Sequence, residues 1–186
     1  MAEAPWKTTK VFGRDEVLAD IERRAFEQAT RIVADTRNVM NDFEVDIYRI
    51  ILGIAKVYGK EKAYEIMSDT VVEKRMMWLE QAWPTLNLQG TDLEKGFEFY
   101  VIKYLRSKEG DYSIVEKTDK KIIFKKREYV NALSNACKVL GIDLIEVQNM
   151  IYARATNFQF ARINPNLRHV VLKYEEGWYT EMVEIL

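Results

Sequence analysis

The sequence predicts an α+β protein in which amphipathic helices pack on an antiparallel sheet built from two β-hairpins. A helical spacing of three to four residues dominates the chain up to about residue 107. From about residue 111, alternating strand patterns mix with short helices, and no run of βαβ units occurs. The length of 186 residues fits a single domain, residues 1–186, with a helical half (about 14–107) and a mixed half (about 111–186). The one candidate seam lies near residues 84–91.

Two helices are predicted before residue 60. The first covers residues 15–36 and carries one apolar stripe, which we expect to be buried. The second begins near Asn41, where Glu44 stands three residues on as in a capping box, and it ends at Gly59. The stripe of the first helix consists of Val17, Leu18, Ile21, Ala25, Ala29, Ile32 and Val33.

Two more helices are predicted before the strands begin. One runs from about Lys60 to Ala82 and ends before Pro84 in the segment WPTLNLQGT. The next starts at Thr91, whose capping-box partner is Glu94, and reaches Gly110. The stretch MMWLEQAW near the end of the earlier helix has two interpretations, a hydrophobic ligand box or, more commonly for such a stripe, core or subunit contact.

A first β-hairpin is predicted in DYSIVEKTDKKIIFKKRE, residues 111–128, around the turn at residues 118–120. Phe124 shares strand parity with Ile122 and is expected to point inward. The basic residues favour solubility and protection of a sheet edge over nucleic-acid binding, because base stacking needs interleaved aromatic side chains. These residues are Lys117, Lys120, Lys121, Lys125, Lys126 and Arg127.

The remaining elements are two helices and a closing hairpin. A short helix in YVNALSNACKVLG ends at Gly141, and Asp143 with Glu146 caps the last helix. The final hairpin turns at residues 176–177. The inner face of the short helix is predicted to hold Val130, Leu133, Ala136, Cys137 and Leu140, and that of the last helix Val147, Met150, Ile151 and Arg154.

Composition and motifs exclude several classes of function. A formal charge of −1 gives no general attraction to nucleic acid or to anionic lipid. One Cys and one His cannot form a Cys/His zinc site, and no glycine-rich nucleotide loop or G-x-S-x-G elbow occurs. We therefore expect no metal, no cofactor, no nucleic-acid partner and no membrane partner. The N-terminus lacks the apolar run of a signal peptide, and the single Cys suits a reducing cytoplasm.

Polar residues on apolar faces are the candidate functional residues. Arg154 continues the inner stripe of the last helix, followed by Asn157. A buried guanidinium needs a partner, which is either a carboxylate such as Glu181 or Glu184 or an anionic substrate. Arg162, in the connector that follows, has no explanation from turn chemistry.

Cys137 and His169 each have a structural and a functional interpretation. Cys137 is either an inert buried thiol or a nucleophile, which would need an activating base or a positive field. His169 is either a surface or hydrogen-bonded structural residue or part of a binding site. The segment INPN between them predicts a turn, because Asn before Pro favours turn initiation.

The last third of the chain resembles a known family. ACKVLGID, followed by VQNMIYARATNFQFARINPNLRHVVLKYEEGWYTEMVEIL, is similar to the C-terminal part of L-2-amino-thiazoline-4-carboxylate hydrolase-like proteins. Cys137 matches the first cysteine position of that pattern and Gly177 matches its hairpin glycine. A further cysteine shortly after the glycine is absent, and Thr180 and Glu181 stand there instead.

The resemblance implies a hydrolase that opens a C–N bond in a small carboxylate-bearing, thiazoline-like substrate. Cys137 or Glu181 would be the reactive group. The substrate would be held by Arg154, Asn157, Arg162 and His169. The alternatives are a non-catalytic domain that binds a small anionic molecule, and a helix-mediated homo-oligomer that uses Trp78 and Trp83.

Overall fold

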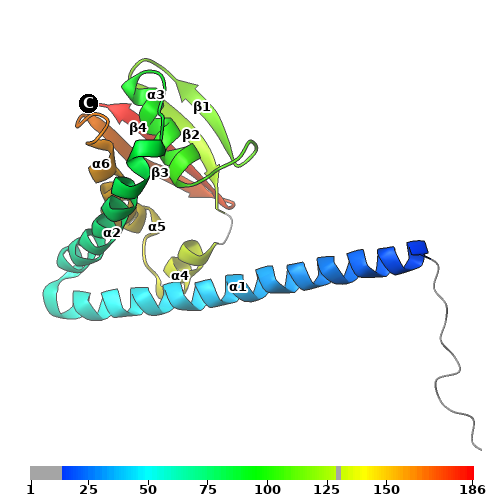
Figure 1. Ribbon diagram of the computed structural model, residues 1–186. Helices are drawn as coiled ribbons and strands as arrows, with labels where there is room; N and C mark the ends of the chain where they lie inside the picture. The colour runs from blue at the N-terminus through cyan, green and yellow to red at the C-terminus, as the bar shows by residue number, and fades with distance from the viewer. Residues whose placement is uncertain (1–13, 129–130) are drawn as a thin grey trace, which may run out of the picture. The chain divides into compact units, whose positions relative to one another are not determined.

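The computed structural model describes residues 14–128 and 131–186, and the chain divides into two compact units, residues 1–40 and 41–186. The division falls inside a helix rather than near residues 84–91. The sequence-based interpretations of the N-terminus, of Val17 and of Val130 concern residues or side chains outside the described ones. The α+β class is confirmed (Figure 1).

Helix α1 (Arg14–Tyr58) replaces the two helices predicted before residue 60. Nothing between residues 36 and 41 breaks a helix, because the segment holds neither Gly nor Pro. Asn41 is therefore helical and caps nothing, and its side-chain oxygen has no hydrogen-bond partner in the described part of the chain. The apolar stripe predicted to be buried is also exposed, with Ile32 and Val33 both more than half accessible. Among the described residues, no helix is long and apolar enough to cross a membrane.

The helices of the second unit that come after α1 begin and end near the start and stop signals predicted from the sequence. Helix α2 (Lys60–Ala82) ends where Pro84 enters the 3-10 turn η1 (Trp83–Thr85). Thr91 and Glu94 form the predicted capping box of α3 (Asp92–Phe97), which continues as the π-helix η2 (Glu98–Tyr104) and so ends before Gly110. Later in the chain come α4 (Ala132–Leu140), α5 (Leu144–Val147), the π-helix η3 (Gln148–Ala153) and α6 (Arg154–Phe160).

The π-helix η3 changes which residues of the last helical segment face inward. Val147 and Ile151 are buried as predicted, but Met150 is exposed. A π-turn takes more residues than an α-turn, which rotates the positions that follow it. Asp143 caps α5 by accepting hydrogen bonds from the N–H groups of residues 145 and 146, as the sequence predicts, whereas the Glu146 side chain pairs with Lys60 instead of completing the predicted cap.

The sheet is antiparallel and has the strand order β1-β2-β4-β3 (Figure 1). It consists of two hairpins, and its inner strands β2 and β4 join them. Helices α3 and α6 pack against it, and α2 packs on α6 and η3. The strands are β1 (Tyr112–Lys117), β2 (Lys121–Arg127), β3 (Leu167–Glu175) and β4 (Trp178–Ile185).

The prediction that the basic hairpin protects a sheet edge is wrong for its second strand. Strand β2 pairs with β1 on one side and β4 on the other, so it has no free edge. Its residues alternate between the two faces, and Ile122, Phe124 and Lys126 therefore share the helix-covered face. The Lys126 side chain is 15% exposed, whereas Lys125 on the opposite face is exposed.

Two hydrophobic clusters form the core of the second unit. The first joins the helix-covered face of the sheet to α2, α3, η2 and α6, and Trp78 packs edge-on against Tyr104 at its margin. The MMWLEQAW stretch therefore contributes to the core, as one of its interpretations holds. The second cluster joins the C-terminal part of α1, the start of α2 and helices α4 and α5, with Tyr48 and Ile151 completely buried.

We expect Thr91→Ala to lower the free energy of unfolding by about 1 kcal/mol, because it removes the hydroxyl that caps α3. Thr70→Ala is the matched control. Thr70 is an exposed mid-helix residue whose hydroxyl donates a hydrogen bond to the carbonyl of Ile66 in its own helix. Urea denaturation of both variants measures the difference. Equal stability of the two variants would contradict a role for the cap.

Candidate functional site

A buried polar network lies on the helix-covered face of the sheet. Glu181 on β4 stands opposite Phe124 on β2 and Val171 on β3. Lys126 and His169 each lie two residues along the neighbouring strands, so both reach Glu181 diagonally. The Lys126 Nζ is 3.1 Å from Glu181 Oε1, and His169 Nε2 is 2.9 Å from Glu181 Oε2. The two predicted site residues Glu181 and His169 are thus brought into direct contact.

Tyr100, from the π-helix η2, covers this network. Its ring centroid lies 4.3 Å from that of His169, and Lys126 donates a 3.4 Å hydrogen bond to its hydroxyl. The Lys126 ammonium also lies over the rings of Tyr100 and Tyr179, at 5.5 and 5.2 Å from their centroids. Aromatic faces favour a nearby cation, which helps to offset the loss of water around Lys126.

The charges of the network follow from burial and pairing. Burial alone raises the pKa of Glu181, but the Lys126 ammonium and the His169 hydrogen bond outweigh it and hold that pKa at about 2. Burial, with the nearby cations Lys126 and Arg75, lowers the pKa of His169 against the opposing effect of Glu181. At neutral pH the network is therefore an ion pair joined to a neutral imidazole.

The neutral state of His169 fixes where its proton lies. An ionised carboxylate only accepts hydrogen bonds, so Nε2 of His169 must carry the proton and donate it to Glu181. The other ring nitrogen, Nδ1, is then a buried acceptor, and it has no hydrogen-bond partner among the described residues. Such an unpaired nitrogen costs stability, and the ion pair beside it has to offset that cost.

Arg75 is a second buried cation next to the network. It lies on α2 and donates hydrogen bonds to the Thr156 hydroxyl at 2.6 Å and to the Tyr152 carbonyl at 3.0 Å. Its guanidinium also stacks 4.9 Å from the centroid of Tyr104. Arg75 is not among the site residues predicted from the sequence, although it lies four residues after Val71 and four before Leu79 on the buried stripe of α2.

Arg154 does not pair with Glu181 or Glu184, as one interpretation of the sequence expected. Its guanidinium donates to Ser68 and Asp69 on α2, both at 2.7 Å. It is about one-third exposed and lies beside the ring of Phe158, 5.3 Å from its centroid. This pair ties α6 to α2, which supports the salt-bridge interpretation of Arg154 with a different partner.

Asn157 bonds the backbone of the outer edge strand β3. Its side-chain oxygen accepts from the N–H of His169 at 2.6 Å, and its amide donates to the same residue's carbonyl at 3.4 Å. Asn149 makes the same pair of hydrogen bonds with Val171: its side-chain oxygen accepts from the N–H and its amide donates to the carbonyl, both at 2.9 Å. The two amides replace a neighbouring strand along this edge, which satisfies its backbone groups and protects it from pairing with another chain.

Cys137 lies in the second hydrophobic cluster and is almost completely buried. Burial, together with the carboxylates of Glu44, Glu128 and Asp143, raises the pKa of its thiol to about 12. A thiol with so high a pKa stays protonated at neutral pH, and the thiolate is the nucleophilic form. The surroundings of Cys137 therefore favour an inert thiol.

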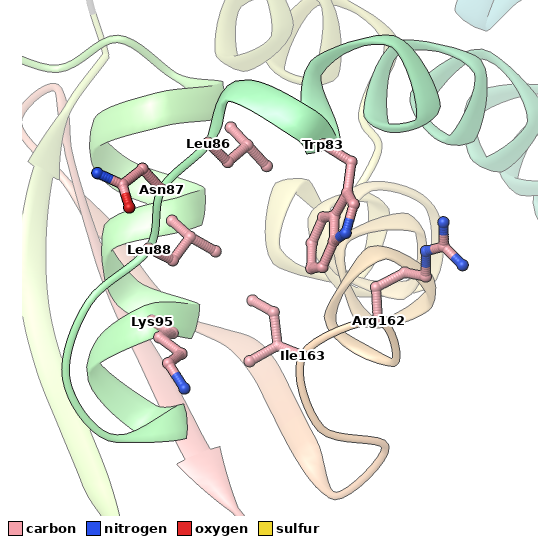
Figure 2. A pocket seen from close by; sticks show the side chains of 7 residues that line it. All are labelled: Trp83, Leu86, Asn87, Leu88, Lys95, Arg162 and Ile163. Carbon is pink, nitrogen blue, oxygen red and sulfur yellow. The ribbon is translucent and has the colours of Figure 1, made fainter.

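A cavity of about 320 Å³ lies between the segment after α2 and the connector after α6 (Figure 2). Its walls are mainly apolar, and Figure 2 shows Leu88 and Ile163 facing each other across it. Arg162 lies at its edge beside the Trp83 ring, with the guanidinium 5.6 Å from the ring centroid and pointing away from Leu88 and Ile163 in Figure 2. The lining residues are Trp83, Leu86, Asn87, Leu88, Lys95, Arg162 and Ile163.

Local sequence determines the shape of this cavity. Pro84 ends α2, and Asn87 adopts a left-handed backbone conformation that redirects the chain toward α3. On the opposite wall, Asn164 accepts a hydrogen bond from the N–H of Asn166 at 2.9 Å, which is the turn predicted from INPN. Asn164 also donates to Asp92 at 3.0 Å and so joins the connector to the start of α3.

The cavity is bordered by two cations. The Nζ of Lys95 on α3 lies 3.4 Å from Oδ1 of Asp92. Arg162 has no carboxylate partner within residues 14–128 and 131–186. Of the predicted substrate-binding residues, only Arg162 lines this cavity; Arg154, Asn157 and His169 bind protein groups elsewhere. The described residues also contain no group of three or more His, Cys, Asp or Glu side chains that would hold a metal ion.

Comparison with protein-family models, curated proteins and solved structures found no match to this chain.

We expect Lys126→Met to destabilise the protein by about 3–5 kcal/mol, because it leaves the buried Glu181 carboxylate without its cation. Lys125→Met is the matched control, since it removes the adjacent lysine from the opposite face of the same strand. Urea denaturation measures both. Adding Glu181→Gln to Lys126→Met should recover part of the loss, and no recovery would contradict the pairing.

We expect the stability of the protein to fall as the pH drops below about 6.5 because of His169. Its pKa is lower in the folded chain than in the unfolded one, so the unfolded state takes up the proton first. The slope approaches about 1.4 kcal/mol per pH unit for one proton. The chain has a single His, so His169→Gln should flatten the slope between pH 7 and about 5.5. A slope that is unchanged in this variant would contradict the assignment.

Proposed function

We propose that the protein binds a small, largely apolar carboxylate-bearing molecule in the cavity beside Trp83. The observation that carries this proposal is an apolar cavity bordered by Lys95 and Arg162 (Figure 2). Its volume of about 320 Å³ lies at the lower end of the range typical of small-molecule sites. The ligand class agrees with the small anionic partner expected from the sequence.

The walls and the edge of the cavity suit different parts of such a ligand. The Trp83 indole and the side chains of Leu88 and Ile163 offer apolar surface to a ring or short chain. At the edge, the Lys95 ammonium favours a carboxylate. The exposed Arg162 guanidinium points away from Leu88 and Ile163 in Figure 2, and it can bind the carboxylate with two parallel hydrogen bonds once its side chain turns toward the cavity. The ligand would therefore enter with its apolar part first.

Hydrolysis of a C–N bond remains a prediction from the resemblance, and the geometry supports it less well than binding. The Cys137 thiol stays protonated, and both oxygens of Glu181 are held by Lys126 and His169. Neither residue lines the cavity beside Trp83, and Cys137 lines a separate pocket of about 420 Å³. A nucleophile needs an ionised atom that is free to react, which neither a protonated thiol nor a fully paired carboxylate provides, so a binding protein is the better-supported proposal.

We expect the protein to bind cinnamate more tightly than cinnamyl alcohol, which has the same apolar part and no charge. Lys95→Gln and Arg162→Gln should each weaken cinnamate binding about tenfold and leave the alcohol unaffected. Isothermal titration calorimetry measures the affinities. Native mass spectrometry of the freshly purified protein adds a direct search for a co-purified anion.

The control is Arg168→Gln, which removes an exposed cation on β3 that does not line the cavity. If all three variants weakened binding equally, the effect would come from net charge rather than from this site. Equal affinity for the acid and the alcohol, together with no co-purified anion, would contradict the proposal.

A further inference from the structure

Helix α1 contains an apolar heptad repeat. With Phe26 counted as position a, positions a and d are apolar through residue 57 except for Thr36, over more than four heptads. A repeat of this length is typical of a coiled coil, in which these positions face a partner helix. The a positions are Phe26, Val33, Met40, Ile47 and Ile54, and the d positions are Ala29, Thr36, Phe43, Ile50 and Val57.

The chain itself leaves most of this repeat uncovered. In the unit of residues 1–40, Phe26 is 74% exposed and Val33 59% exposed. In the unit of residues 41–186, Phe43, Ile50 and Val57 are 63%, 65% and 73% exposed. Such a concentration of exposed apolar side chains marks an interaction surface.

The exposed apolar side chains of the described residues concentrate on this helix. Eleven of the twenty large hydrophobic residues that are exposed belong to α1. The eleven are Leu18, Ile21, Phe26, Ile32, Val33, Val39, Met40, Phe43, Ile50, Val57 and Tyr58.

The second unit uses one side of α1 for its own core, and part of the repeat lies on that side. Tyr48 and Ile51, at positions b and e of the repeat, are buried in the second hydrophobic cluster. Ile47 and Ile54, at position a, are partly buried and pack against the same cluster. The d positions of the same segment stay exposed. In this segment the face that the core leaves uncovered is therefore the d side of the repeat, with the a positions at its margin.

The sequence of the repeat favours an antiparallel copy of the same helix. In an antiparallel pair each a residue meets a d residue of the other helix, so small side chains oppose large ones. Thr36 and Ala29 then face isoleucines, so each layer of the core holds a similar side-chain volume. A parallel pair would instead place Ala29 against Ala29 and Thr36 against Thr36, and these two layers would hold too little side-chain volume to fill the space between the helices. The antiparallel layers are Phe26 with Val57, Ala29 with Ile54, Val33 with Ile50, Thr36 with Ile47, and Met40 with Phe43.

The charges beside the repeat fit the same arrangement. Arg37 and Glu44 both occupy position e, and e positions of antiparallel helices lie next to each other. Each Arg37 therefore stands near Glu44 of the other copy, once on either side of the two-fold axis. At the g positions, Asp46 falls opposite Val39, so this register places no like charges together.

We propose that two copies of the chain form a homodimer through an antiparallel coiled coil of α1 over residues 26–57, with its two-fold axis between Asn41 and Asp42. The interface is isologous, because each helix presents the same surface to the other. It differs from the helix-mediated oligomer expected from the sequence, since Trp78 and Trp83 take no part.

The first test is the mass of the full-length protein in solution, measured by analytical ultracentrifugation over a range of concentrations. The wild type should be a dimer. Val33→Glu with Ile50→Glu should raise the dimer dissociation constant at least about 100-fold, because each helix would bury two unpaired charges. Both residues are exposed in the single chain, so circular dichroism should show an unchanged helix content.

Val139→Glu is the matched control, because Val139 on α4 is 67% exposed and lies outside the repeat. It should leave the dimer intact. A wild type that stays monomeric throughout, a larger oligomer, or a dimer unaffected by the Val33 and Ile50 changes would each overturn the proposal.

Disulfide cross-linking tests the orientation in a Cys137→Ala background, which removes the only native cysteine. Val33→Cys combined with Ile50→Cys should link two chains, because these positions meet in an antiparallel layer. The two cysteines of one helix lie about 25 Å apart and cannot bond each other. Val33→Cys alone should not cross-link. The opposite result, cross-linking by Val33→Cys alone, would overturn the antiparallel arrangement.

Discussion

The burial of the Glu181 carboxylate is the constraint on which the second unit depends. A buried charge has to be paired, and the partners of Glu181 come from both neighbouring strands, Lys126 on β2 and His169 on β3. A slip of one residue in either strand would turn a partner to the other face and leave the carboxylate unpaired. The network therefore specifies the strand register as well as contributing to stability. Tyr100 encloses it, which places the π-helix η2 over the centre of the sheet.

Hydrogen bonds to the backbone and to polar side chains hold the other helices to this framework. Asn149 and Asn157 occupy the free edge of β3, and this fixes η3 and α6 beside the sheet. Arg154 and Arg75 then join these helices to α2. Four of the polar residues that looked functional in the sequence thus have structural partners: Glu181, His169, Arg154 and Asn157. The cavity beside Trp83 lies outside these contacts, so its cations can bind a ligand without disturbing the framework.

Much of the architecture was predictable because local chemistry determines where elements begin and end. Thr91 with Glu94, Pro84, Gly141 and Asp143 mark helix ends through contacts within a few residues. The two hairpins follow from alternation on either side of short turns. The boundary near Asn41 was wrong because a capping pattern can also lie inside a helix when nothing interrupts it. Lys126 was predicted from its charge to be a solvent-exposed lysine that protects a sheet edge. It nevertheless shares strand parity with Phe124, which was expected to point inward.

The sequence by itself determined the α+β class, the order of the elements and most of their ends. Only the tertiary structure decided which polar residues meet, because Lys126, His169 and Glu181 come together through strand pairing between residues far apart in the chain. It also decided that Arg154 binds Asp69 and that, of the predicted binding residues, Arg162 lines the cavity beside Trp83. Helical periodicity in the sequence showed that α1 has an apolar stripe. Whether that stripe is covered depends on packing partners, which periodicity does not specify.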